Sequence, residues 1–173
     1  MSHFVLTQII GLIAVGISLC VFQTNKRQTM LLLSMSAAIL YTIHFFLLGA
    51  ATGAAMNLIG AGRCYVYFKA KPKKGQLWIP LGFIVISTIG AIVTWQGLLS
   101  LLPLFGSVST GIAFWQKNPK YIRRLNLISS PLWFSYDGIS GSYPGMLIET
   151  IVLCSNLVGM YRFDFRAKQV KAL

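Results

Sequence analysis

Long apolar stretches alternate with short polar breaks along the whole chain. A spanning α-helix needs roughly 20 mostly apolar residues, so stretches of about this length predict transmembrane helices. Seven can be read, at residues 4–22, 30–48, 53–68, 77–95, 99–116, 125–140 and 144–161. No lysine or arginine precedes the first stretch, and Lys26 and Arg27 follow it. A signal peptide has the opposite charge order, so we expect this stretch to be kept as the first span.

The breaks between the stretches are of two alternating kinds, which sets the expected topology. One kind is uncharged and tight, as at residues 49–52, 96–97 and 141–143. The other kind, with the C-terminal tail, holds fourteen of the fifteen lysines and arginines. Cytoplasmic loops retain Lys and Arg, so we expect all basic breaks on the cytoplasmic side. With seven spans, the N-terminus is then outside and the C-terminus is cytoplasmic.

Composition argues against a water-soluble enzyme. Hydrophobic residues make up 55% of the 173 residues and charged residues only 10%, whereas a soluble domain carries about 25% charged residues. The net charge of +12 is also typical of nucleic-acid-binding proteins, but here the bases lie in short clusters between apolar stretches. We therefore expect the lipid bilayer as a partner, through its anionic headgroups, and no nucleic acid.

The sequence indicates no metal, cofactor or enzymatic site. Cys20, Cys64 and Cys154 lie inside apolar stretches, where a thiol packs as a small apolar group, and their odd number argues against a disulfide framework. The two histidines, His3 and His44, are far from any Cys-x-x-Cys pattern, so zinc is not expected. The spans also lack the residue patterns of a metalloprotease or a phosphate-binding loop.

The first three stretches resemble the last three. At an offset of 92 residues, five pairs of identical or comparable residues align: Leu40 with Leu132, Tyr41 with Trp133, Gly49 with Gly141, Gly53 with Gly145, and Asn57 with Glu149. At an offset of 93, residues 22–26 align with residues 115–119. A single span between two three-span units gives both units the same orientation. We therefore predict an all-α integral membrane fold, with seven transmembrane helices arranged as two parallel three-helix repeats joined by a linker helix.

This 3-1-3 arrangement with an outer N-terminus resembles the SWEET and PQ-loop superfamily. More closely, residues 44–49 and 145–156, with Arg162-Phe163, resemble the YgjV family of bacterial inner-membrane proteins. The likeness runs over most of the chain and implies a multi-pass protein of the bacterial inner membrane. The expected parts are a first repeat (1–70), a basic loop with the linker helix (71–97), a second repeat (98–163) and a basic cytoplasmic tail (164–173).

The resemblance to SWEET carriers also implies residues of a substrate pocket. Their second helix has a Leu-Trp-x-x-Tyr-Gly pattern whose Trp lines the pocket. Leu132-Trp133-Phe134-Ser135-Tyr136 is similar to it, with Asp137 in place of the Gly. Asn57 matches their pocket Asn in the first repeat, and Glu149 takes that place in the second repeat.

Ionisable side chains inside a span need a partner or a role, since burying one costs roughly 2.5–3.5 kcal/mol. Glu149 and Asn156 are two turns apart on one face of the last stretch. Glu149 is expected either to hydrogen-bond a neighbouring helix or to line a wet cavity. Asp137 lies near the outer end of its stretch, either in the headgroup region or at the turn before the last span.

Arg63, His44 and the Tyr41–Trp133 pair each leave two readings open. Arg63 either snorkels to the cytoplasmic surface or pairs with Glu149. His44 is either a hydrogen-bonded interior histidine or part of a proton relay. Tyr41 and Trp133 either close a pocket from opposite sides or simply pack in the core.

The leading functional hypothesis is a small-solute carrier or facilitator with its site between the repeats. The candidate substrate-binding residues are Trp133, Glu149, Asn57, Tyr41, Asn156, Asp137, Ser129 and His44. Two acids in the outer half of the second repeat favour a cationic or hydrogen-bonding solute, or proton coupling. The alternative is a non-transporting membrane protein on the same fold, such as a receptor, sorting factor or assembly partner. A small-molecule solute and a second copy of the chain are the remaining candidate partners.

Overall fold

The computed structural model of the chain is all-helical over the residues it describes, which are 3–22, 27–70, 77–116 and 119–161. These ranges form seven α-helices and one 3-10 turn: α1 (His3–Phe22), α2 (Arg27–Leu47), α3 (Ala51–Lys69), α4 (Trp78–Val93), η1 (Leu98–Ser100), α5 (Leu101–Trp115), α6 (Pro119–Ser140) and α7 (Tyr143–Gly159). The expectation of seven helices is therefore confirmed.

The start of α6 is the one helix boundary that departs clearly from its expected position. The apolar stretch predicts a helix from residue 125, but α6 begins at Pro119. Proline is favoured in the first turn of a helix, where its missing N–H costs nothing. The basic residues of this segment therefore occupy the first turns of α6 and not a loop. Their long side chains can reach water from a helix end.

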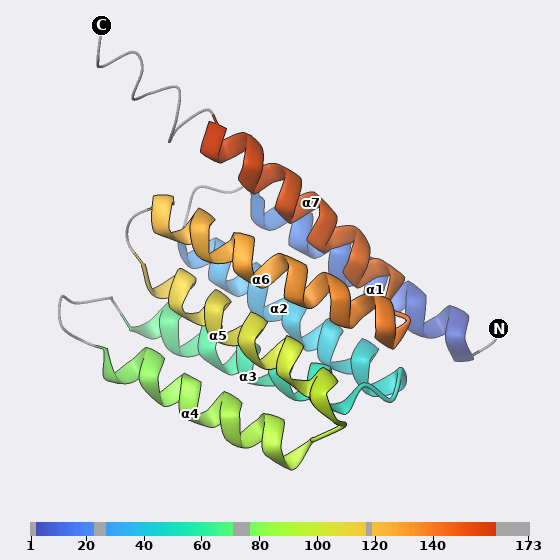
Figure 1. Cartoon of the computed structure of the whole chain (residues 1–173). Helices are drawn as coiled ribbons and strands as arrows, with labels where there is room; N and C mark the ends of the chain where they lie inside the picture. The colour runs from blue at the N-terminus through green and yellow to red at the C-terminus, as the bar shows by residue number, and fades with distance from the viewer. Residues whose placement is uncertain (1–2, 23–26, 71–76, 117–118, 162–173) are drawn as a thin grey trace, which may run out of the picture.

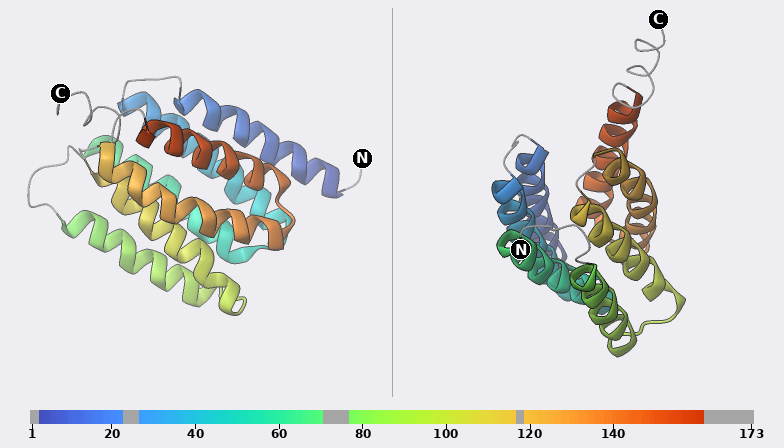
Figure 2. Two further views of the ribbon diagram at one scale, coloured as in Figure 1. Left: turned by 45° about the horizontal axis from the view of Figure 1, so that its top comes forward. Right: turned by 90° about the vertical axis from the view of Figure 1, so that its left-hand side faces the viewer.

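The helices form two layers of three, with α4 along one edge (Figures 1 and 2). In one layer α2 lies between α1 and α3, and in the other α6 lies between α5 and α7. The layers meet where α3 contacts α5 and where α1 contacts α7. Helix α4 packs against both α3 and α5, so it bridges the two layers.

Four segments of the described chain are long and apolar enough to cross a bilayer: His3–Val21, Gln28–Leu47, Leu98–Trp115 and Tyr143–Met160. Helix α4 is apolar but has only 16 residues. The other two helices have sufficient length but carry charges, Arg63 and Lys69 in α3 and three basic residues in the first turns of α6. The spanning of α3, α4 and α6 therefore remains a prediction.

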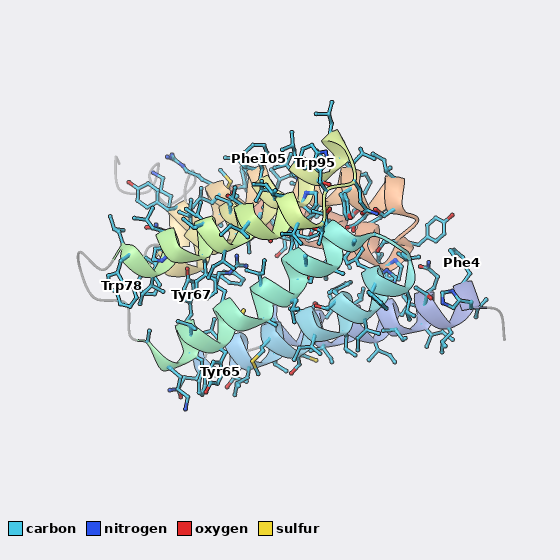
Figure 3. The ribbon with its side chains drawn as sticks, turned by 90° about the horizontal axis from the view of Figure 1, so that it is seen from below. Phe4, Tyr65, Tyr67, Trp78, Trp95 and Phe105 are labelled. Atoms are coloured by element: carbon cyan, nitrogen blue, oxygen red, sulfur yellow. The ribbon has the colours of Figure 1, made fainter. Side chains whose placement is uncertain are left out.

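Exposed aromatic side chains mark the two ends of α4. Trp78 and Trp95 are 68% and 49% exposed, and Figure 3 shows them at opposite ends of this helix. At 1.5 Å of rise per residue they are roughly 25 Å apart along the axis, close to the thickness of a hydrocarbon core. Trp prefers the membrane–water interface, and outward residues between the two, such as Val85 and Ile89, are apolar. This pattern suits a helix that crosses a bilayer.

One end of the bundle, opposite the N-terminus of the chain, holds the C-terminal ends of α1, α3, α5 and α7 (Figure 1). The basic breaks of the sequence follow these helix ends. Nine of the fourteen lysines and arginines in these breaks lie outside the described residues, and so do residues 23–26 and 117–118 of the two aligned segments, 22–26 and 115–119. The two uncharged turns that follow α2 and α6 lie at the other end of the bundle.

The α2–α3 turn and the α6–α7 turn have the same backbone geometry. Gly49 and Gly141 have φ angles of +73° and +72°. The next residue in each turn lies at φ −85° and ψ 69° in the first turn and at φ −88° and ψ 81° in the second. The amide of that residue donates to a carbonyl five residues earlier, Ala50 to Phe45 at 2.9 Å and Ser142 to Asp137 at 2.8 Å. All these equivalent positions differ by 92 residues.

The two turn glycines should be hard to replace. A positive φ costs a residue with a Cβ roughly 1–2 kcal/mol, so Gly49→Ala and Gly141→Ala should each lower the melting temperature by roughly 2–6 °C. The matched control is Gly16→Ala on α1, where an added Cβ meets open space and the helix favours alanine. Thermal unfolding of the purified protein measures all three. Equal melting temperatures for the turn variants and the control would contradict this assignment.

Candidate functional site

Aromatic rings fill the space where the two layers face each other. Phe45 of α2 lies 6.0 Å from Trp133 and 5.8 Å from Tyr136 of α6, measured between ring centroids. Tyr41 packs on Phe45 at 6.2 Å, one turn away on α2. The ring contact of α2 with Trp133 is thus made by Phe45, which sequence reasoning did not single out. Tyr41 and Trp133 belong to the same packed cluster.

Glycines on α3 and α5 leave room for the rings of Tyr136 and Trp133 to pack directly against these helices. A Cβ at Gly53 of α3 would lie 2.6 Å from the Tyr136 ring, and one at Gly106 of α5 would lie 2.6 Å from the Trp133 ring. The Gly53 amide donates to the Tyr136 hydroxyl at 2.9 Å. Because the first amides of a helix lack intrahelical acceptors, Tyr136 caps α3 from the opposite layer. In α7 the equivalent amide, at Gly145, donates instead to the side chain of its own N-cap, Ser142, at 3.2 Å.

His44 joins three helices through two hydrogen bonds. It is fully buried, with Nδ1 2.8 Å from the Thr7 carbonyl of α1 and Nε2 2.8 Å from the Ser142 hydroxyl that precedes α7. A carbonyl only accepts, so Nδ1 carries a proton; Nε2 can then accept from Ser142, whose oxygen still accepts the Gly145 amide. A Cβ at Gly11 would lie 2.9 Å from the imidazole. His44 therefore occupies an interior, hydrogen-bonded position.

Two carboxylic acids of the second layer lie near each other. Asp137 of α6 is only 2% exposed, and its carboxyl carbon would lie 2.5 Å from a Cβ at Gly145 of α7. Glu149 of α7 is half-buried, interacts electrostatically with Asp137 and hydrogen-bonds Ser130 of α6. Of the two expected positions of Asp137, the contacts match the turn before α7: its carbonyl accepts from the Ser142 amide, and Gly145 leaves room for its carboxyl group in the packed interior.

Several polar atoms near these acids have no hydrogen bond. One oxygen of Asp137 is buried without a partner, and the Tyr41 hydroxyl lies beside the Ser18 side chain of α1 and within the electrostatic reach of both acids. Gln8 of α1 donates to the Gly141 carbonyl at 3.0 Å, while its own oxygen is buried and unpartnered. A buried polar atom without a partner costs free energy, so this cluster has unused capacity to bind a ligand, a water or a proton.

Other candidate residues make local contacts. Asn57 of α3 donates to the Gly53 carbonyl of its own helix at 3.0 Å. Ser129 of α6 donates to the Gly106 carbonyl of α5 at 2.9 Å and lies 2.7 Å from the Thr110 hydroxyl. Asn156 of α7 is half-buried, with its amide nitrogen buried and unpartnered. The structure thus brings Tyr41, His44, Trp133, Asp137 and Glu149 to the region between the layers.

Three polar residues of this region, Ser142, Gln8 and Ser130, were not predicted from the sequence. Ser142 precedes Tyr143-Pro144 at the start of α7, and a serine before a proline in the first turn is a usable N-cap signal. Gln8 and Ser130 have no such local signal. Among the described residues, no group of three His, Cys, Asp or Glu side chains could hold a metal ion.

The Ser142 hydroxyl caps α7 by accepting the Gly145 amide, and it also hydrogen-bonds the His44 imidazole. Ser142→Ala should therefore lower the melting temperature by roughly 4–10 °C, since it removes the cap and leaves Nε2 buried without a donor. Ser36→Ala is the matched control, because the Ser36 hydroxyl is exposed and bonds only its own helix. In a double-mutant cycle with His44→Ala, the two effects should be less than additive. Full additivity would mean that the hydrogen bond between them contributes nothing.

The comparisons with known proteins agree with a membrane location. The family model described as "Bacterial inner membrane protein" matches residues 5–167. A curated relative, inner membrane protein YgjV of Escherichia coli (strain K12), is 26% identical over 164 residues, which cover 94% of this chain and 87% of the relative. No solved structure matches the chain. The chain therefore belongs to the YgjV family of bacterial inner membrane proteins.

Proposed function

We propose that this protein is a small-solute carrier or facilitator with its site between the two layers. The observation that carries the proposal is the pair of acids, buried Asp137 and half-buried Glu149, with unpartnered polar atoms beside it. Ionisable groups inside a membrane bundle are expensive and usually mark a solute or proton pathway. A bundle that needed only stability would have apolar residues at these positions.

The proposed architecture is two parallel three-helix repeats, α1–α3 and α5–α7, joined by α4 as in SWEET-like proteins. Support comes from the two turns of equal geometry at an offset of 92 and from the equal packing order in both layers. Transporters built from such repeats bind their solute at the repeat interface and alternate access by rocking one unit against the other. Both acids belong to the second unit and lie within the electrostatic reach of Tyr41 in the first unit, which supports a site at this interface.

The chemistry of the site favours a cationic or hydrogen-bonding solute, or coupling to a proton. Carboxylates attract cations, and an oxygen without a partner can accept a hydrogen bond from a solute. Residues opposite the acids include the Tyr41 hydroxyl and aromatic rings, whose faces also attract cations. We propose that the protein is not an enzyme and does not bind nucleic acid. The lipid bilayer is its proposed permanent partner.

A second candidate function is that of a non-transporting receptor, sorting factor or assembly partner. The filled interface favours it, because Phe45, Trp133 and Tyr136 occupy the space between the layers. A carrier on this fold must move these rings to admit a solute. A partner protein that purifies in fixed proportion with the chain, without any solute flux, would support this second function.

Solute flux into proteoliposomes tests the carrier proposal. We would measure uptake of radiolabelled organic monocations and neutral polyols by wild type, Asp137→Asn and Glu149→Gln. Loss of a hydrogen bond to a charged group costs roughly 1.5–3 kcal/mol, so either substitution should reduce uptake of the transported solute about tenfold or more. Glu149→Gln should also flatten the pH dependence of uptake if a proton is coupled to it.

Ser135→Ala is the matched control for this flux measurement. Ser135 is exposed on α6, two residues before Asp137, and its hydroxyl bonds only the Pro131 carbonyl of the same helix. This variant should transport like wild type. If wild type shows uptake and Asp137→Asn retains it with the same pH profile, the acids are not part of the pathway. If wild type takes up no solute class, the carrier function is wrong.

Reporter fusions test the proposed orientation, with the N-terminus outside. A green fluorescent protein placed after Lys74 or after Lys117 should fluoresce, because both points lie in basic breaks that cytoplasmic loops favour. Alkaline phosphatase placed after Gly97 should be active, because this turn lies at the opposite end of the bundle. A fusion after Arg124 would interrupt α6 and is unsuitable. Activity of phosphatase after Lys74 would reverse the proposed topology.

A further inference from the structure

We infer that Arg63 is the charged ligand of a small-anion site at the junction of α3, α4 and α5. This site is separate from the acids proposed to bind a solute, which lie on α6 and α7. Neither reading of Arg63 from the sequence describes the structure. The side chain is only 5% exposed, so it does not snorkel, and within the described residues it makes no ion pair with Glu149.

The Arg63 guanidinium is held against α5 and is incompletely satisfied. One terminal nitrogen, Nη1, donates to the Ser107 carbonyl at 2.8 Å. The same nitrogen would lie 2.8 Å from a Cβ at Gly111, so this glycine makes room for the charged group. The Nε atom is buried and has no hydrogen-bond partner. A buried, positively charged donor without an acceptor is costly and calls for a compensating negative charge.

The chain itself offers little negative charge to Arg63. It has three acidic residues, and Asp137 and Glu149 are both on the second layer, near each other. The third, Asp164, lies outside the described residues. The groups that interact electrostatically with Arg63 are Cys64 and Tyr67, both neutral in their ordinary protonation state. The compensating charge is therefore most simply supplied by an anion from solution.

A small cavity next to Arg63 sets the size of that anion. Its volume is about 10 Å³, and Arg63, Ser87 of α4 and Gly111 of α5 are among its lining residues. This is close to the minimum space for one water-sized species. Ser87 is 1% exposed and supplies a hydroxyl to an otherwise apolar wall. The space limits the anion to a single atom such as chloride, which is larger than water and would push the apolar wall outward slightly, with the guanidinium on one side and the hydroxyl on another.

Aromatic packing argues against a lipid phosphate as the anion. Tyr67 is one turn closer than Arg63 to the basic end of α3, and its ring lies 4.9 Å from Trp115 and 5.9 Å from Phe83. Figure 3 shows Tyr67 between the helices, whereas Tyr65 points away from the bundle. Phe83 lines the cavity and packs against Tyr67, which packs against Trp115, so a headgroup entering from the basic end would have to displace these rings. The basic residues beyond them raise the local concentration of small anions.

Thermal unfolding of the full-length protein in nanodiscs of zwitterionic lipid tests the site. Sodium chloride replaces sodium gluconate at constant ionic strength. A chloride concentration tenfold above its dissociation constant should raise the melting temperature by roughly 3–6 °C, with a saturable dependence. Arg63→Gln should abolish this shift. Ser87→Val, which keeps the guanidinium and fills the cavity with methyl groups, should abolish it too; Thr88→Val, at the exposed neighbouring position, should retain it.

Several results would overturn the inference. One is equal wild-type melting temperatures in chloride and gluconate. Another is a chloride shift that persists in both Arg63→Gln and Ser87→Val. A shift produced by anionic phosphatidylglycerol in the nanodisc but not by chloride would assign the charge to a lipid headgroup and reject a small-anion site. If Asp164→Asn removes the response to chloride as completely as Arg63→Gln, the tail and not the cavity is responsible.

Discussion

Hydrocarbon gives a buried polar group no water to bond, and this constraint explains the placement of most polar side chains in the bundle. Serine and threonine hydroxyls return to carbonyls of their own helices, as at Ser18 and Thr42. His44 and Tyr136 satisfy carbonyls, hydroxyls and helix-end amides on other helices. Few buried side-chain atoms of the described residues stay unsatisfied after this accounting. Two of them, the Arg63 Nε and one Asp137 oxygen, belong to charged residues on which the two proposals rest.

Glycines make room for these polar side chains between the helices. Without water, a polar or aromatic side chain must reach its partner through a neighbouring helix surface, and glycine removes the Cβ that would block it. His44, Tyr136 and Trp133 each enter such a gap, and so do the charged groups of Arg63 and Asp137. Helices in membranes lack a hydrophobic driving force between them, so close contacts of this kind also contribute to packing. The same glycines therefore contribute to helix packing and let charged and polar side chains lie between the helices.

The sequence predicts the number of helices and nearly all of their boundaries, because the apolar period and the turn glycines are local signals. The contacts of the candidate site are not local. Asp137 was expected in the headgroup region or at the turn before the last span, but the burial of its carboxyl group depends on Gly145 of another helix. Arg63 was expected to snorkel or to pair with Glu149, but it donates to the Ser107 carbonyl beside Gly111, inside the bundle. Such pairings depend on which helix faces meet, and one sequence does not contain that information.

The two turns of equal geometry carry different residues at the same place. Phe45 and Asp137 accept the same type of turn hydrogen bond and pack against equivalent glycines, one with a ring and the other with a carboxylate. Two identical units paired by symmetry would present either two rings or two carboxylates there. A charge on one side facing an apolar surface on the other needs two distinguishable units on a single polypeptide. The fused chain can thus have an electrical polarity across its midline that no symmetric homodimer of one half could have.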